Sequence, residues 1–342
     1  GMDTTTADAN IAIGACALCK NTTGGHNIAI GFRGMDANTT ASYNTAIGSQ
    51  ALESNTTGTC NQAFGYSAMN QGTTGSYNTA IGSRAAHSIT TGAANVALGK
   101  DSLYYLTTGT HNTAVGNAAL INTNTGTFNT GSGSYALYTN TTGTHNSGFG
   151  GCALYSNTTG CNNVAVGHDA LRTNTTANHN TAIGMCSLYA NTSGTGSTAV
   201  GSGALRDNTC GNYNTAVGLN ALKSNTCCGR NTAVGAYALT ASQSGCRNTA
   251  VGYSSLTTLT SGKLNTATGY WSMAYMTTGC NNTASGYKAM ECSTTAKYSA
   301  ALGSFALRLN TTGCCNSAVG YMALRGNTTG ASNVAVGLMA LC

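Results

Sequence analysis

The hydrophobic and polar positions of this chain repeat every 17 residues. Residues 44–58 typify the repeat, reading Asn-Thr-Ala-Ile-Gly, two variable residues, Ala-Leu, two variable residues and Asn-Thr-Thr-Gly. We number its columns from the glycine that ends the first motif, which is column 0. That glycine recurs in twenty repeats, at Gly14, Gly31, Gly48, Gly65, Gly82, Gly99, Gly116, Gly133, Gly150, Gly167, Gly184, Gly201, Gly218, Gly235, Gly252, Gly269, Gly286, Gly303, Gly320 and Gly337. Such a fixed period is typical of repeat proteins, so we expect one continuous array over residues 1–342, with no separate cap or catalytic domain.

Columns −4 to −1 predict a short β-strand, for example residues 44–47. Branched residues dominate columns −3 and −1, Ala fills column −2 in almost every repeat, and Asn and Gly bound the segment. Because strand side chains alternate, columns −1 and −3 share one face and column −2 points to the other. We expect column −1 and column +4, which is nearly always Leu or Met, to fill the interior. The uniformly small face of column −2 then contacts either the opposite wall of a thin solenoid or a neighbouring subunit.

Columns +7 to +10 often read Asn-Thr-Thr-Gly and predict a turn, because Gly adopts positive φ and Asn and Thr bond their own backbone. Column +12 often holds His, Tyr or Phe, and in successive coils these rings would stack into a ladder. Solenoids of helix pairs need about 33 residues or more per repeat, which disfavours a helical array. The predicted fold class is therefore all-β, a parallel β-solenoid (β-roll) of about 20 coils with 17 residues per coil.

The distribution of charged and apolar residues disfavours nucleic-acid binding and a membrane span. Only 6% of the residues are charged, and 41% are hydrophobic, which fits a structured and nearly uncharged array better than disorder. The 14 Lys and Arg residues are scattered and form no run, whereas nucleic-acid binding requires a dense basic stripe. No apolar run reaches the length of a membrane span. We therefore expect neither nucleic acid nor a membrane span.

Asn-X-Ser/Thr sequons make glycosylation the leading predicted modification, and with 15 cysteines they indicate an oxidising, extracellular setting. The candidate asparagines, all but Asn281 in column +7, are Asn21, Asn38, Asn55, Asn140, Asn157, Asn174, Asn191, Asn281, Asn310 and Asn327. Where the asparagine is lost a threonine pair often remains, as at Thr73, Thr74, Thr90, Thr91, Thr107, Thr108, Thr277 and Thr278. These pairs indicate either a threonine ladder or O-linked sugar, unless the whole motif is only good turn chemistry. Apart from covalent glycans we expect no cofactor.

The cysteines match no zinc-binding pattern, since the Cys-X-X-Cys at residues 16–19 stands alone. Cys210 and Cys227 share a column in adjacent repeats, and Cys228 and Cys246 nearly do. Stacked coils lie about 4.8 Å apart, within the Cα separation of a disulfide, so we expect at least one inter-coil disulfide among these four. The alternative is free, buried thiols. Candidates for links between subunits are Cys16, Cys19 and Cys342.

The segments 112–116, 163–167 and 333–337, which read Asn-Thr-Ala-Val-Gly or Asn-Val-Ala-Val-Gly, resemble repeats in the heads of trimeric autotransporter adhesins. The fuller unit resembles repeats of phage tail-fibre-like proteins and of extracellular glycosylated fibrils. The resemblance covers the whole chain and implies a left-handed parallel β-roll, usually trimeric. The sequence departs from adhesins in showing no coiled-coil stalk or membrane anchor, and from tail fibres in showing no distinct tip or chaperone domain, which favours a pure shaft or fibril.

Catalysis finds little support. The eight acidic residues fall mostly in different columns, and no phosphate-binding loop, HExxH motif or calcium-binding repeat occurs. The neighbours His168 and Asp169 fit a surface variation better than part of a catalytic triad. Ice binding by regular threonines is a distant alternative, because no Thr-X-Thr strand recurs; a thermal-hysteresis measurement tests it.

Together these patterns predict a non-enzymatic structural subunit of an extracellular, glycosylated fibre that assembles by stacking of solenoid chains. We expect the chain outside the cell or on the surface of a cell or virion. The main alternative is an adhesin or viral tail-fibre shaft that binds a cell surface. The expected partners are other copies of the chain and cell-surface or matrix glycans.

Overall fold

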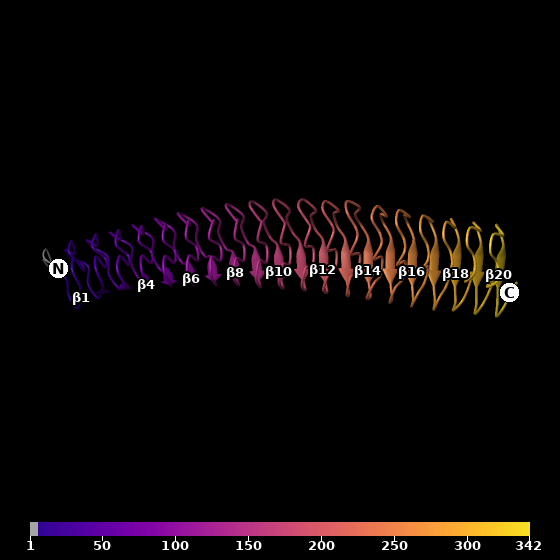
Figure 1. Cartoon of the computed structure of the whole chain (residues 1–342), viewed down its shortest axis with the longest axis horizontal. Coiled ribbons are helices and arrows are strands. Elements are labelled where there is room, and N and C mark those ends of the chain that lie inside the picture. Colours follow the sequence, from indigo (N-terminus) through magenta and orange to yellow (C-terminus); the bar gives the residue numbers. More distant parts are fainter. Residues whose placement is uncertain (1–5) are drawn as a thin grey trace. The chain divides into compact units, whose positions relative to one another are not determined.

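The computed structural model describes residues 6–342, which fold into short β-strands joined by turns (Figure 1). The chain divides into two compact units, Gly1–Thr176 (unit 1) and Ala177–Cys342 (unit 2). Over the described range there are twenty three-residue strands, one per repeat, and no helix, so none that could cross a membrane. The predicted all-β parallel solenoid, with about 20 coils of 17 residues, is confirmed.

Each strand occupies columns −3 to −1 and is one residue shorter than predicted. The reason is that the backbone amide at column −4 bonds to a side chain, as Asn61 N donates to Asn44 Oδ1 at 2.8 Å. Unit 1 contains β1 (Ile11–Ile13), β2 (Ile28–Ile30), β3 (Thr45–Ile47), β4 (Gln62–Phe64), β5 (Thr79–Ile81), β6 (Val96–Leu98), β7 (Thr113–Val115), β8 (Thr130–Ser132), β9 (Ser147–Phe149) and β10 (Val164–Val166). Unit 2 contains β11 (Thr181–Ile183), β12 (Thr198–Val200), β13 (Thr215–Val217), β14 (Thr232–Val234), β15 (Thr249–Val251), β16 (Thr266–Thr268), β17 (Thr283–Ser285), β18 (Ala300–Leu302), β19 (Ser317–Val319) and β20 (Val334–Val336).

Within each unit, every strand pairs in parallel with the strand of the next coil. The register is one full repeat, so that Thr215 lies opposite Thr232 and Val217 opposite Val234. The same register holds from β1 to β10 and from β11 to β20. Figure 1 shows the strands of each unit in chain order. Residues of one column are therefore stacked along each unit, about 4.8 Å apart.

Columns −2, +3 and +4 line the interior of each coil. In the coil of β13, Ala216, Ala221 and Leu222 are all 0% exposed, whereas Val217 in column −1 is 36% exposed. The prediction that column −1 fills the interior is therefore wrong, while column +4 does line it. Since successive strand residues point to opposite faces, burying Ala216 forces Val217 outward.

The interior is thin, and this explains why alanine occupies column −2. Gly131 stands in that column of β8, and an added Cβ atom would lie 3.2 Å from Leu120 Cγ and 3.4 Å from the carbonyl oxygen of Ala136. Both neighbours belong to columns +4 and +3 of the opposite wall. Of the two predicted neighbours of the small face, the opposite wall is thus the one in contact. A larger side chain here would push the walls apart, at a cost of about 1–3 kcal/mol.

Two ladders of buried asparagines, in columns −4 and +7, satisfy the backbone inside the coil. Asn44 in column −4 donates from Nδ2 to the carbonyl of Gly58 at 2.9 Å, and its Oδ1 accepts the amide of the next coil's Asn61. In column +7, Asn38 Nδ2 donates to Asn21 Oδ1 at 2.8 Å. Buried polar groups are generally hydrogen-bonded, and these side-chain amides bond to the coil next to them.

Column 0 is glycine in all twenty repeats because its backbone excludes other residues. Gly218 has a φ of +132°, and an added Cβ would lie 2.6 Å from the backbone carbonyl carbon of Gly235. Such a conformation is essentially restricted to glycine. Columns +12, +2 and +4 also have positive φ in most coils, as at Tyr213, Asn220 and Leu222, a feature that the sequence did not predict.

Candidate functional site

Columns +7 to +12 form one edge of each coil, here called the turn edge, and carry most predicted glycosylation sites. The column +7 candidates Asn21, Asn38, Asn55, Asn140, Asn157, Asn174, Asn191 and Asn310 are at most 1% exposed, and Asn327 is half-buried. An N-linked glycan attaches to the side-chain nitrogen. In Asn191 that atom, Nδ2, already donates to the carbonyl of Gly194 at 3.0 Å. A glycan on these residues requires the turn to open.

Column +7 belongs to the interior even where it carries no asparagine. Ile89, Leu106, Leu259 and Met276 occupy it in other coils and are fully buried. The asparagines of this column therefore serve the buried ladder, and a following threonine completes the sequon pattern. N-glycosylation stays a prediction here. Among the candidate asparagines, Asn281 differs because it lies in column +12 and is exposed.

The predicted threonine sites fall into two columns with different environments. In column +8, Thr73, Thr90, Thr107 and Thr277 donate from Oγ1 to the backbone carbonyl of column +8 in the next coil, at 3.1–3.3 Å. In column +9, Thr74, Thr91, Thr108 and Thr278 are exposed. Column +8 is thus a threonine ladder, whereas the exposed hydroxyls of column +9 are the accessible candidates for O-linked sugar.

Rings of column +12 stack wherever they occur in consecutive coils. In unit 1, His26 stacks on Tyr43 with ring centroids 5.0 Å apart. His111, Phe128 and His145 form a longer stack with centroid distances of 4.7 and 5.0 Å. The predicted ladder therefore exists in runs, which smaller side chains in other coils interrupt.

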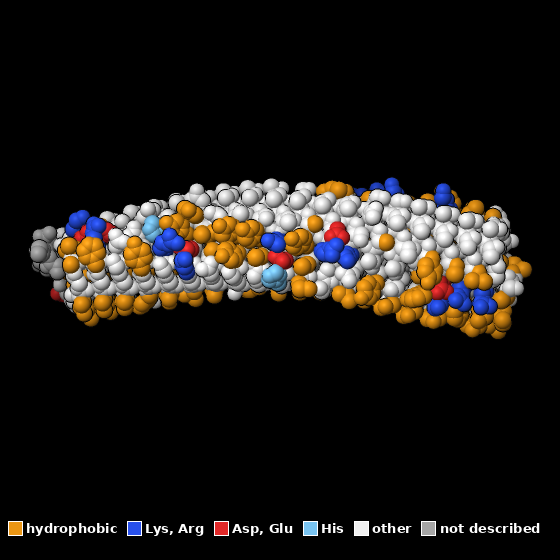
Figure 2. Space-filling model, in the orientation of Figure 1, with side chains coloured by type: hydrophobic (Ala, Val, Ile, Leu, Met, Phe, Trp, Pro, Cys, Tyr) orange, Lys and Arg blue, Asp and Glu red, His pale blue; other side chains and the backbone are white. Residues whose placement is uncertain are grey.

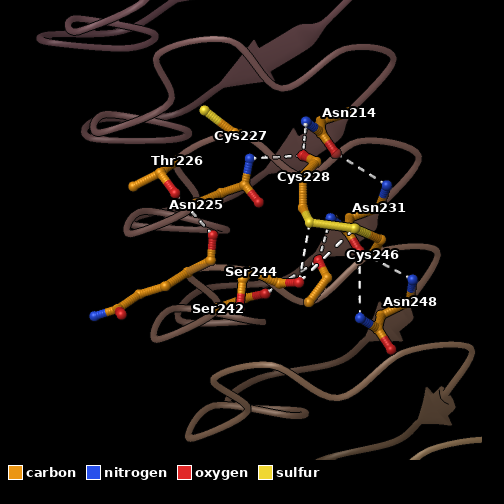
Figure 3. Close-up of a disulfide and its surroundings, with 12 residues drawn as sticks. Asn214, Asn225, Thr226, Cys227, Cys228, Asn231, Ser242, Ser244, Cys246 and Asn248 are labelled. Carbon is orange, nitrogen blue, oxygen red and sulfur yellow. Dashed lines mark hydrogen bonds between the residues drawn. A yellow bond between two sulfur atoms is a disulfide. The ribbon is translucent and has the colours of Figure 1, made fainter.

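Two disulfides link adjacent coils at the turn edge of unit 2. Cys210 joins Cys227 with a Cα separation of 4.6 Å, and Cys228 joins Cys246 with a Cα separation of 5.2 Å. These are the pairings that the column alignment predicts. Figure 3 shows the second disulfide beside the asparagine ladders, where Asn225 Nδ2 donates to the carbonyl of Cys228 at 2.9 Å. The disulfides therefore link consecutive turns next to the buried asparagine side chains.

The three cysteines predicted to link subunits form no disulfide within the chain. Cys16 and Cys342 are exposed and Cys19 is half-buried. Burial raises the pKa of the Cys19 thiol, and a hydrogen bond with Cys16 raises it further, so Cys19 is a poor nucleophile at neutral pH. A role of these three cysteines in linking subunits stays a prediction.

Several charged side chains outside the turn edge pair with one another. Glu291 accepts Arg308 Nε at 2.6 Å and lies 3.1 Å from Lys288 Nζ, and its hydrogen bond raises the pKa of Arg308. His168 Nδ1 lies 3.0 Å from Asp169 on the surface. Within residues 6–342, no group of three or more His, Cys, Asp or Glu side chains is placed to hold a metal ion.

The side chains of column −1 point outward and form what we call the outer row. It includes Ile81, Val115 and Phe149 in unit 1 and Val217 and Leu302 in unit 2, all at least one-third exposed. Column −3, mostly threonine, runs beside it. Figure 2 shows apolar side chains gathered in rows on the surface, while charged side chains lie in small clusters. Monomeric proteins rarely expose so extended an apolar strip, which marks the outer row as a candidate contact surface.

No protein-family model matches the chain, and a search of curated proteins finds no match.

Proposed function

We propose that the chain is the structural subunit of an extracellular fibre and that its copies associate side by side through the outer row. The observation that carries this proposal is the composition of column −1. Across the twenty repeats it is apolar in seventeen and Ser or Thr in three, and it is never charged. The chain's own Ala, Leu and Asn side chains already fill the interior, so folding alone does not require bulky apolar residues there.

The size of the outer row suits lateral association. Burying the exposed half of one Val or Ile side chain contributes roughly 1 kcal/mol. The ten coils of one unit would supply about 10 kcal/mol against an association cost of about 4–15 kcal/mol. A single unit's row therefore gives marginal association, and a longer row gives a stable one. This length dependence is what a fibre built from many equal coils needs.

Two further features support an extracellular, glycosylated fibre. The disulfides Cys210–Cys227 and Cys228–Cys246 suit an oxidising compartment. The exposed threonines of column +9 offer attachment points for O-linked sugar on the turn edge, which leaves the outer row free for protein contacts. End-to-end stacking of chains, which the sequence also predicts, is compatible with lateral association.

The test places charge on the outer row. In the full-length chain, Val217→Lys combined with Val251→Lys puts two cations on the row two coils apart, which avoids direct repulsion between neighbouring strands. Ser244→Lys combined with Thr278→Lys, at exposed turn-edge positions with the same spacing, is the matched control. Sedimentation velocity and negative-stain electron microscopy then compare assembly of the three proteins.

We expect the wild type and the control to assemble, and the outer-row variant to need at least about tenfold higher concentration because two buried charges lack partners. Thermal unfolding checks that the variant still folds. A wild type that stays monomeric at high concentration overturns the proposal, and so does unchanged assembly of the outer-row variant.

The exposed rings of column +12 favour a second candidate, an adhesin or viral tail-fibre shaft that binds surface glycans. Tyr77 is 68% exposed and its ring suits stacking against a sugar ring, and Tyr43, which stacks on His26 with one face, keeps the other face for the same contact. A glycan array probed with the wild type and with Tyr77→Ala tests this role. Glycan binding that Tyr77→Ala weakens supports it, and the absence of binding removes it.

A further inference from the structure

The two units differ sharply in charge. Unit 1 holds five Lys and Arg and six Asp and Glu, whereas unit 2 holds nine Lys and Arg and only two acidic residues. Those two acids, Asp207 and Glu291, pair with Arg206, Lys288 and Arg308. Six cations of unit 2 take part in none of the ion pairs between described residues, and three of the six gather in one place.

That place is a cleft of about 440 Å³ on the turn edge of unit 2. Arg230, Arg247 and Lys263 line it, together with Tyr213 and Asn212. The two arginines occupy column +12 of consecutive coils, and Lys263 follows in column +11 of the next coil. Because 17 and 16 residues separate them in the sequence, the three cations lie in successive coils of the fold.

The backbone and a disulfide hold the two arginines side by side. Arg230 N donates to the carbonyl of Asn212 at 3.0 Å, and Arg247 N donates to the carbonyl of Gly229 at 3.3 Å. Cys246, which also lines the cleft, is bonded to Cys228 and so links the coils of the two arginines, while Cys227 is bonded to Cys210 in the coil of Tyr213. The cleft is thus preorganised, which lowers the entropic cost of binding a ligand.

The lining chemistry calls for an anion. Guanidinium groups one coil apart repel each other, and a bound oxyanion would relieve that repulsion while accepting paired hydrogen bonds from the Arg forks. Asn212 Oδ1 accepts the amide of Thr195 at 2.7 Å, so the NH2 group of Asn212 remains as a further donor. No carboxylate side chain lines the cleft.

We infer that this cleft binds an anionic polysaccharide, with a sulfate or carboxylate group held by Arg230 and Arg247 and a sugar ring against Tyr213. The Tyr213 side chain is 60% exposed and offers one ring face beside the cations. Proteins that bind single-stranded nucleic acid stack successive bases on several aromatic side chains. This cleft is lined by one aromatic side chain, which favours a polysaccharide over a nucleic acid. The inference does not rest on assembly through the outer row.

The experiment measures heparin binding to the full-length protein by calorimetry at low salt. Arg230→Gln combined with Arg247→Gln is compared with Lys223→Gln combined with Arg325→Gln, which removes the same charge from column +5 of unit 2. We expect the cleft variant to lose about tenfold or more in affinity and the control about twofold or less, because charge-assisted hydrogen bonds outweigh screened charge. Arg230→Lys combined with Arg247→Lys keeps the charge but removes the forks, and should give an intermediate loss.

Further ligands identify the anion and the sugar. Polygalacturonate carries only carboxylates, so its binding relative to heparin distinguishes a carboxylate from a sulfate site, and dextran is the neutral control. Tyr213→Ala should weaken binding of the preferred polysaccharide about threefold through loss of the ring contact. The inference is overturned by equal losses in the cleft and control variants, by binding of dextran as tight as that of the anionic chains, by the absence of polysaccharide binding, or by single-stranded DNA binding as tightly with the same dependence on the cleft.

Discussion

Units 1 and 2 are built from the same coil but differ at its turn edge. Both bury alanine in column −2 and leucine in column +4, as Leu103 and Leu222 show, and both carry the apolar outer row. In column +12, however, unit 1 stacks His111 on Phe128, whereas unit 2 places Arg230 in the cationic cleft. Both disulfides of the described chain also lie in unit 2. The comparison teaches that the buried columns −2, +3 and +4 determine the fold of each coil, so the residues of the turn edge can vary.

The largest expected effect follows from changing the shared interior. Leu222 is fully buried, whereas Leu219 in the same coil is 43% exposed, so the two offer one chemistry in two environments. Leu222→Ala should lower the free energy of unfolding by about 3 kcal/mol, and Leu219→Ala by less than about 0.5 kcal/mol. Leu103→Ala should match Leu222→Ala if the units share one interior. Denaturant unfolding measures all three, and similar losses at Leu219 and Leu222 would contradict the assignment of the interior.

A smaller effect should separate the two units. Cys210→Ser combined with Cys227→Ser removes a link that closes a 17-residue loop, which should destabilise the surrounding coils by about 2 kcal/mol. Hydrogen exchange followed by mass spectrometry reports each unit separately. Exchange should rise in the coils around β13 and stay unchanged in unit 1. An equal rise in both units would show that the disulfide does not act locally.

The smallest effect on stability concerns sugar on the turn edge. When the chain is secreted from a eukaryotic host, Asn281 should carry an N-linked glycan and Asn191 should not, because Asn281 is exposed and Asn191 is buried. Enzymatic removal of the glycan should change the free energy of unfolding by less than about 0.5 kcal/mol. Site-resolved mass spectrometry measures occupancy. Glycan on Asn191 in folded protein would refute the buried ladder of column +7.

Spacing alone was enough to predict the coil and the disulfides. A period of 17 residues without a gap fixes which residues stack, and Cys210 and Cys227 follow directly from it. The period does not show which face of each strand is buried. Branched apolar residues usually mark the interior, but in this chain they lie on the outer face. Here the opposite wall lies so close that a Cβ atom added to Gly131 would lie 3.2 Å from Leu120 Cγ, and only small side chains fit. That distance depends on the folded path of the whole coil.

Two features of the turn edge are difficult to recognise from the linear sequence. Asparagine before two threonines has the form of a sugar site, although the buried Leu106 and Leu259 in the same column indicate an interior position. Arg230 and Arg247 look scattered in the chain because a full coil separates them. Aligning column +12 by repeat brings them together, so the signal was present in the sequence. The cleft that they line depends on the folded turns and could not be read from the alignment.

The most direct test of the central claim is the cross-section of assembled particles, measured by electron cryo-microscopy of the full-length protein. The claim is that the outer row, which both units carry, is a contact between copies. We predict particles with two or more solenoids side by side, in which Val217 and Ile81 are buried against a neighbouring copy. Particles only one chain wide, with the outer row facing solvent, would contradict it.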